Sequence, residues 1–155
     1  MIHPTSLVHA KAKVASSASI GPWCIIEEDV EIGENVVLEC RVRVCSGTRI
    51  ATKTIVYDGA VLGAPPQDLK YQGERTFLEI GNSCVIREYC TLNKGTAATG
   101  STVIGDGVLI MAYSHVGHDS VLGKGAVLAN GVQLGGHVHI GSFATIGGNT
   151  AVHQF

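Results

Sequence analysis

An imidazole and a carboxylate stand side by side in the segment His115-Val116-Gly117-His118-Asp119. Histidine can take a proton from a hydroxyl group near neutral pH, and a neighbouring carboxylate can fix its tautomer and raise its basicity. No serine or cysteine lies in a recognisable nucleophile motif. Direct attack by a substrate hydroxyl is therefore a simpler mechanism for His118 and Asp119 than one through a covalent acyl-enzyme.

The elements that must position this pair follow from a repeat. An aliphatic residue recurs at every sixth position from Ile2 to Val152, and of these 26 positions only Asp68, Glu74 and Ala98 are not large and aliphatic. Neither a helix nor an isolated strand has this period. It is typical of hexapeptide repeats, in which three short parallel strands form one coil of about 18 residues. The sequence predicts an all-β, left-handed parallel β-helix, with the hand taken from this class of repeat.

In such a coil, residues 18 positions apart lie above one another on neighbouring turns. Three pairs of interest are stacked in this way: Asp119 with His137, His118 with Gly136, and Gly135 with His153. The cluster therefore lies on one edge of the prism, and it brings a glycine N–H close to the imidazole of His118. Because such an N–H can stabilise an oxyanion, the set suits acyl transfer to an alcohol.

Two polar, turn-rich stretches interrupt the repeat, at residues 64–76 and 93–101. We expect both to be loops ejected from the coil. Solenoids place such insertions on one face, which is often the binding face. The first stretch contains Gln67-Asp68-Leu69-Lys70, which fits a solvated turn and a ligand-reaching arm equally well.

Composition excludes several classes of protein. The length of 155 residues predicts one domain, residues 1–155, and the net charge of −2 does not favour nucleic acid or an anionic membrane as a partner. Without a run of 18 apolar residues, no integral membrane association is expected. The five cysteines have no C-x-x-C spacing, so we expect small core residues and neither disulfides nor a thiolate zinc site.

The start and the end of the repeat lead to two further predictions. The repeat begins at Ile2, which predicts that there is no signal peptide and that the protein is cytoplasmic. It stops part-way through a coil at Phe155 with no capping element, so we expect a domain that is incomplete at its C-terminus.

Two other functions remain open at this point. His115 and His118 have an i, i+3 spacing and His137 follows about one coil later, as a zinc site would require. Hexapeptide-repeat carbonic anhydrases bind zinc through three histidines, two of them from neighbouring subunits. The abrupt C-terminus also fits a trimeric scaffold without catalytic activity.

A closer resemblance appears in six longer segments. They are Gln67–Glu74, Ile86–Glu88, His115–Asp119, Leu128–Asn130, Gly136–Val138 and Ile146–Phe155. In order and spacing they resemble the UDP-N-acetylglucosamine O-acyltransferases, which catalyse the first step of lipid A synthesis. The D-L-K-Y-x-G-E loop and the closing A-V-H-Q-F are specific to that family. The H-x-x-H-D segment is less so, because sugar N-acyltransferases of the same superfamily carry similar versions. The N-acyltransferase that acts later in the pathway would be expected to have a uridine-binding domain before the coils.

The resemblance implies a homotrimer with active sites between adjacent subunits and with neither cofactor nor metal. The implied reaction moves a 3-hydroxyacyl chain from acyl carrier protein to the 3-hydroxyl of UDP-N-acetylglucosamine. By position, His118 is similar to the general base, Asp119 to its orienting carboxylate and Gly136 to the oxyanion donor. The implied substrate contacts are Gln67, Asp68, Lys70, His115, His137, His153 and Gln154.

The chain departs from this family in two respects. Its second interruption begins Asn93-Lys94-Gly95-Thr96, where many relatives have His-Arg-Gly-Thr. This change could alter substrate contacts or reflect a preference for a 3-amino sugar. Family members also continue with further coils and a helical region that complete the nucleotide site, measure acyl length and help to dock the carrier protein.

Overall fold

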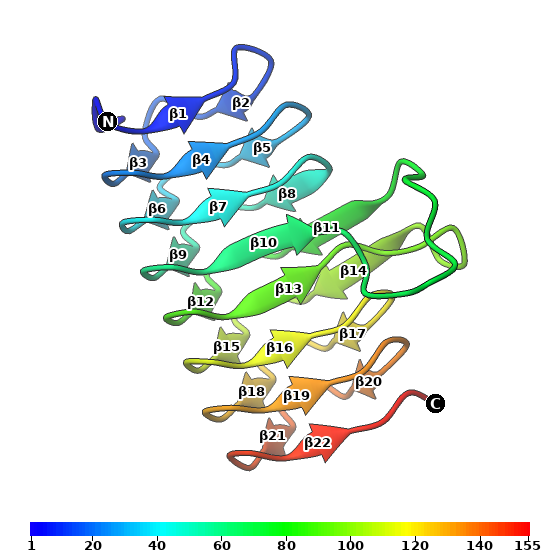
Figure 1. Cartoon of the computed structure of the whole chain (residues 1–155). Coiled ribbons are helices and arrows are strands. Elements are labelled where there is room, and N and C mark those ends of the chain that lie inside the picture. The colour runs from blue at the N-terminus through cyan, green and yellow to red at the C-terminus, as the bar shows by residue number, and fades with distance from the viewer.

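The computed structural model describes residues 1–155 as a three-sided prism built from parallel strands. The chain passes through each of three sheets once per coil. In Figure 1 it crosses the front sheet from left to right and returns behind it while descending from the N-terminus to the C-terminus, which is the left-handed sense. The predicted left-handed parallel β-helix is confirmed.

Each sheet is a ladder of very short strands. The first sheet contains β1 (Leu7–Val8), β4 (Ile25–Ile26), β7 (Arg43–Val44), β10 (Val61–Ala64), β13 (Thr91–Asn93), β16 (His115–Val116), β19 (Gln133–Leu134) and β22 (Ala151–Val152). The second contains β2 (Lys13–Val14), β5 (Glu31–Ile32), β8 (Thr48–Ile50), β11 (Phe77–Ile80), β14 (Ser101–Ile104), β17 (Val121–Leu122) and β20 (His139–Ile140). The third contains β3 (Ser19–Ile20), β6 (Val37–Leu38), β9 (Ile55–Val56), β12 (Val85–Ile86), β15 (Leu109–Ile110), β18 (Val127–Leu128) and β21 (Thr145–Ile146).

The pairing register shows where the repeat is interrupted. Along the third sheet, Val37 pairs with Ile55 18 positions later, and Leu109 pairs with Val127 at the same interval. In between, Ile55 pairs with Val85 and Val85 with Leu109, at intervals of 30 and 24 positions. These two longer coils contain the ejected loops, and both loops leave the prism at the corner between the first and second sheets.

The ejected loops are shorter than the sequence suggests. They comprise residues 65–76, here called the first loop, and residues 94–100, the second loop. Ala64, Asn93 and Ser101 were expected to be loop residues, but they belong to strands β10, β13 and β14. The prediction was wrong there because small or polar residues can extend a strand when the neighbouring coil offers backbone partners.

Inward aliphatic side chains form one column through the prism. Leu92, Val116 and Leu128 in the middle coils are fully buried, whereas Val8 and Val152 near the ends are only partly buried. The buried cluster contains 31 residues. Because each coil covers the apolar side chains of its neighbours, the core is shared along the whole stack.

A second inward position lies two residues before each aliphatic residue, and the sequence pattern did not predict it. Residues smaller than leucine fill it in most coils, including Cys24, Cys84, Cys90 and Ser120, all of them buried, and Leu78 is the exception. All five cysteines are free and four are buried, as expected of core residues, while Cys40 is half-buried.

The corners place the functional side chains. Most corners turn through a residue at positive φ, three positions after the aliphatic residue, and Asp119 (φ 60°) and His137 (φ 58°) occupy this place on successive coils. At Gly117, a steric constraint and not a positive φ excludes a side chain. A Cβ there would lie 2.5 Å from the carbonyl carbon of Gly135, so the close approach of two coils requires the glycine.

The structure contains no helix that could cross a membrane.

Candidate active site

A groove of about 480 Å³ opens beside the corner from which both loops leave. Its walls come from the first loop and from the C-terminal coils, and His118 and Gly136 face each other within it. The lining residues are Gln67, Asn93, His115, Gly117, His118, Gln133, Leu134, Gly135, Gly136, Ala151, Val152, His153 and Gln154. Most residues of the predicted cluster therefore meet in one groove.

A larger groove, of about 930 Å³, lies elsewhere, along the second sheet and its corner with the third. Three of its charged side chains pair with one another, since Lys13 bonds to Glu31 at 2.9 Å and Arg49 lies 3.7 Å from Glu31. It contains neither a histidine nor an unpartnered buried polar side-chain atom. The smaller groove is therefore the better candidate for chemistry.

The His118–Asp119 pair has the geometry of an oriented base. Nδ1 of His118 lies 2.7 Å from Oδ2 of Asp119. An ionised carboxylate can only accept hydrogen bonds, so in the neutral imidazole the proton resides on Nδ1 and Nε2 carries the lone pair. The side chain of His118 is 13% exposed and that of Asp119 is fully buried, which limits competition from water.

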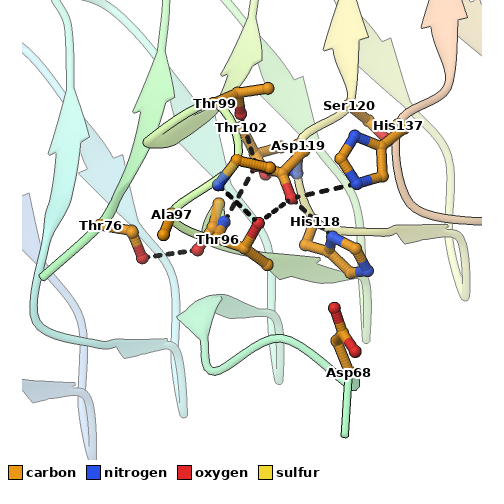
Figure 2. Close-up of polar contacts among 12 residues, drawn as sticks. Asp68, Thr76, Thr96, Ala97, Thr99, Thr102, His118, Asp119, Ser120 and His137 are labelled. Atoms are coloured by element: carbon orange, nitrogen blue, oxygen red, sulfur yellow. Dashed lines mark hydrogen bonds and ion pairs between the residues drawn. The ribbon is translucent and has the colours of Figure 1, made fainter. Parts of the chain in front are cut away.

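Three threonines surround Asp119 in Figure 2. Thr96 donates its backbone N–H to Oδ1 at 2.9 Å and its hydroxyl to Oδ2 at 2.8 Å, and the hydroxyl of Thr99 donates to Oδ1. The backbone N–H of Asp119 in turn donates to the hydroxyl of Thr102 at 2.8 Å. Burial alone would raise the pKa of Asp119, but hydrogen bonds from Thr99, His118 and Thr96 outweigh it and lower the pKa to about 2. The carboxylate is therefore ionised at neutral pH.

Gly136 lies directly against the imidazole ring. A Cβ at this position would be 2.5 Å from Cε1 and 2.6 Å from Nε2 of His118, so only glycine fits. The hydroxyl of Ser120 donates to the carbonyl of Gly135 at 3.1 Å and fixes the orientation of the Gly135–Gly136 peptide. Because the peptide is trans, its N–H points the opposite way, out of the core. That N–H makes no hydrogen bond within the chain, so it is free to bind an oxyanion.

The other histidines of the cluster differ in their surroundings. Nδ1 of His115 lies 2.7 Å from the hydroxyl of Thr91, and burial lowers the pKa of His115, which keeps the ring neutral. Nε2 of His137 lies 3.6 Å from Oδ2 of Asp119, too far for a hydrogen bond, and its ring stacks on Phe155. His137 therefore flanks the carboxylate and does not line the groove.

Of the first-loop residues 67–70 that were predicted as a possible ligand-reaching arm, only some reach the groove. Gln67 lines the groove, and Figure 2 shows the carboxylate of Asp68 directed toward His118. Oδ1 of Asp68 also accepts the backbone N–H of Lys70 at 3.0 Å, which holds the turn. The side chain of Lys70 is exposed and outside the groove.

Sequence reasoning missed several residues of this site. Thr96 and Thr99 lie in a loop outside the repeat that located the other residues, and nothing in the repeat distinguished Thr102 on β14. Asn93 appeared only as a departure from a family pattern, yet it is 3% exposed and lines the groove. Its Oδ1 is the only buried side-chain N or O atom without a hydrogen-bond partner, so an acceptor is available there for a ligand.

The zinc alternative requires a different set of residues from the one that the sequence suggests. His118, Asp119 and His137 each bring one nitrogen or oxygen within 4.8 Å of the others, but His115 is not among them. Both oxygens of Asp119 already accept hydrogen bonds, and one of the donors is Nδ1 of His118. These hydrogen bonds satisfy the cluster without an ion.

The fold and the groove together place the chain in the class of hexapeptide-repeat proteins, and a family model supports that class. The model described as bacterial transferase hexapeptide (six repeats) matches residues 101–136. This segment includes β14 to β19 and contains His118, Asp119 and Gly136.

Individual relatives show to which family the chain belongs. The acyl-(acyl-carrier-protein)–UDP-N-acetylglucosamine O-acyltransferase of Saccharophagus degradans is 46% identical over 124 residues, which are 79% of this chain and 48% of the relative. The solved structure of LpxA from Acinetobacter baumannii is 43% identical with a TM-score of 0.97, and the match includes 99% of this chain and 60% of that one. For LpxA from Bacteroides fragilis, a UDP-N-acetylglucosamine acyltransferase, the identity is 32%, the TM-score is 0.86 and the shares are 98% and 67%. The chain belongs to the UDP-N-acetylglucosamine O-acyltransferase family. It spans about half the length of the curated relatives that it matches.

Proposed function

We propose that this protein transfers a 3-hydroxyacyl chain from acyl carrier protein to the 3-hydroxyl of UDP-N-acetylglucosamine, the first step of lipid A synthesis. The observation that carries the proposal is the position of His118 between Asp119 and Gly136. Membership of the family and the names of the relatives supply the substrates.

In the proposed mechanism, Nε2 of His118 takes the proton of the sugar hydroxyl as its oxygen attacks the thioester carbonyl carbon. The N–H of Gly136 stabilises the resulting oxyanion. When the C–S bond breaks, His118 returns the proton to the departing thiolate. Asp119 stays ionised throughout and stabilises the imidazolium that forms between the two proton transfers.

Further residues contact the substrates in this proposal. Gln67, Asp68 and Lys70 of the first loop act on the sugar and pantetheine side. His115, His153 and Gln154 provide supporting contacts within the groove, and His137, which does not line it, supports the site beside Asp119. The protein works as a cytoplasmic homotrimer whose active sites lie between subunits, and residues 1–155 act as a single β-helical domain.

Acyl transfer by the purified chain tests the proposal. We expect turnover of UDP-N-acetylglucosamine with 3-hydroxyacyl carrier proteins, and we expect His118→Ala to abolish nearly all of it. His139→Ala is the matched control, because His139 is exposed on β20 and lies outside the groove. A His118→Ala variant that keeps most of the rate would refute His118 as the base. A parallel assay with the 3-amino sugar nucleotide shows whether the amine is preferred.

A metal-binding trimer is the alternative from the sequence, and the cluster of His118, Asp119 and His137, already satisfied by hydrogen bonds, does not favour it. Metal analysis of the purified protein separates it from the acyltransferase, because this candidate requires stoichiometric zinc. The third alternative is a trimeric scaffold without catalytic activity. It predicts an intact trimer that turns over no acyl donor.

A further inference from the structure

The second loop leaves the prism immediately before the coil that carries His118, and it folds back onto Asp119. Thr96 and Thr99 supply three of the donors to this carboxylate, two from side chains and one from the backbone. Residues 94–100 lie outside the repeat, so these contacts are not a consequence of coil stacking.

We propose that Thr96 and Thr99 are positioning residues, which hold the carboxylate of Asp119 so that Oδ2 faces Nδ1 of His118. This inference rests on the proposed role of His118 as the base. Neither threonine lines the groove, so they act through Asp119.

The directions of the hydrogen bonds carry the inference. The N–H of Thr96 and the hydroxyl of Thr99 both donate to Oδ1, so this oxygen is anchored on the loop side. Oδ2 is left to accept from the hydroxyl of Thr96 and from His118. A carboxylate rotates easily about its last bond unless both oxygens are engaged. The four donors therefore fix the plane of the carboxylate and, through it, the plane of the imidazole.

The loop itself is braced by the first loop. The hydroxyl of Thr76 donates to the carbonyl of Gly95 at 2.5 Å, and Glu74 accepts the N–H of Ala97 at 3.4 Å. Thr96 is 8% exposed, which protects its hydrogen bonds from water. Thr99 is exposed at the loop surface, so the loss of its hydroxyl should disturb packing very little.

The test compares Thr99→Val, which removes the hydroxyl at nearly constant volume, with Thr99→Ser, which keeps it. The first readout is the pKa of Asp119 itself, followed by NMR in protein with ¹³C-labelled aspartate and assigned with Asp119→Asn. We expect Thr99→Val to raise that pKa by about one pH unit, because a hydrogen bond to a charged group is lost. Thr99→Ser should restore the wild-type value.

The second readout is kinetic. With correct alignment lost, kcat should fall about tenfold in Thr99→Val while KM for the sugar nucleotide stays unchanged, and Thr99→Ser should recover the rate. Thr54→Val is the structural control, since the buried hydroxyl of Thr54 donates to the carbonyl of Gly81 at 2.9 Å away from the groove. It should lower stability and leave both the pKa of Asp119 and kcat unchanged.

Two results would overturn the inference: an unchanged pKa of Asp119 in Thr99→Val, or the same loss of rate in Thr99→Ser and Thr54→Val as in Thr99→Val. If the pKa responds as expected but no form of the protein, wild type included, turns over the sugar nucleotide, the positioning contacts stand and the proposed function falls.

Discussion

At the scale of single residues, the site depends on the absence of a side chain at position 136. In Gly136→Ala the new Cβ would lie within 2.6 Å of the His118 ring, so the ring must move away from its place beside Asp119. We expect a loss of about 100-fold in kcat, since a displacement of about 1 Å can cost this much. Gly141→Ala is the control, because a Cβ there meets no atom within 4 Å. Equal rates in the two variants would contradict the contact.

The lowered pKa of Asp119 predicts how the stability of the protein depends on pH. Its pKa is lowered to about 2, below the ordinary value of 3.8, so its contribution to stability is present above pH 3.8 and is lost as the pH falls through about 2. Asp119→Asn lacks this titration. We expect the difference in unfolding free energy between wild type and variant to shrink by on the order of 2 kcal/mol between about pH 6 and pH 2. Denaturant unfolding at several pH values measures this, and a constant difference would show that Asp119 titrates normally.

The sequence predicted residue contacts where the repeat applies, and only there. The period of 18 placed His118 beside Gly136 and Asp119 above His137, and the structure has both pairs. It could not predict that Thr99 bonds to Asp119, because that contact depends on the path of a loop outside the repeat. The orientation of the Gly136 N–H also escaped prediction, since it requires knowing that Ser120 holds the preceding carbonyl.

At the scale of the elements, the two residues of a two-residue strand point to opposite sides of the sheet. On β17, Leu122 points into the column and is 1% exposed, whereas Val121 points outward and is 37% exposed. We expect Leu122→Ala to lower the free energy of unfolding by about 2–5 kcal/mol, through lost burial and the cavity left behind. Val121→Ala should change it by less than about 0.5 kcal/mol. Denaturant unfolding followed by circular dichroism distinguishes the two, and similar losses would contradict the alternation of sides.

The loops show why the strands of a solenoid are easier to predict than its insertions. A strand of two residues needs only one inward aliphatic side chain and backbone partners on the neighbouring coil, and both follow from the repeat. The limits of the second loop depend on pairs such as that between Ala64 and Asn93, across an irregular register in β10. Such local pairing produces no repeating pattern in the sequence, so the loop limits could not be predicted from it.

At the scale of the whole molecule, the three outer faces of the prism differ in chemistry. The outward side chains of the third sheet form an aliphatic ladder, Val37, Ile55, Val85, Leu109 and Val127, all half-buried. The second sheet presents charged side chains at its N-terminal end, among them Lys13, Glu31 and Arg49. In the proposed trimer, the aliphatic face is therefore the surface that we expect to pack against a neighbouring subunit.

A charge placed on that ladder tests the assembly. Leu109 is the fourth of its five side chains and faces outward, so Leu109→Glu should leave the core of the prism intact and break the trimer into monomers. Burying an unpaired carboxylate between subunits costs several kcal/mol, which is enough to separate them at micromolar concentration. Light scattering after size exclusion gives the mass of each form, and circular dichroism checks that the coils remain folded. Lys124→Glu, at an exposed corner, is the control and should stay trimeric. A Leu109→Glu variant that remains trimeric would place the interface on another face.

If the active sites lie between subunits, the Leu109→Glu monomer should also lose acyl transfer while retaining the NMR signature of the His118–Asp119 pair.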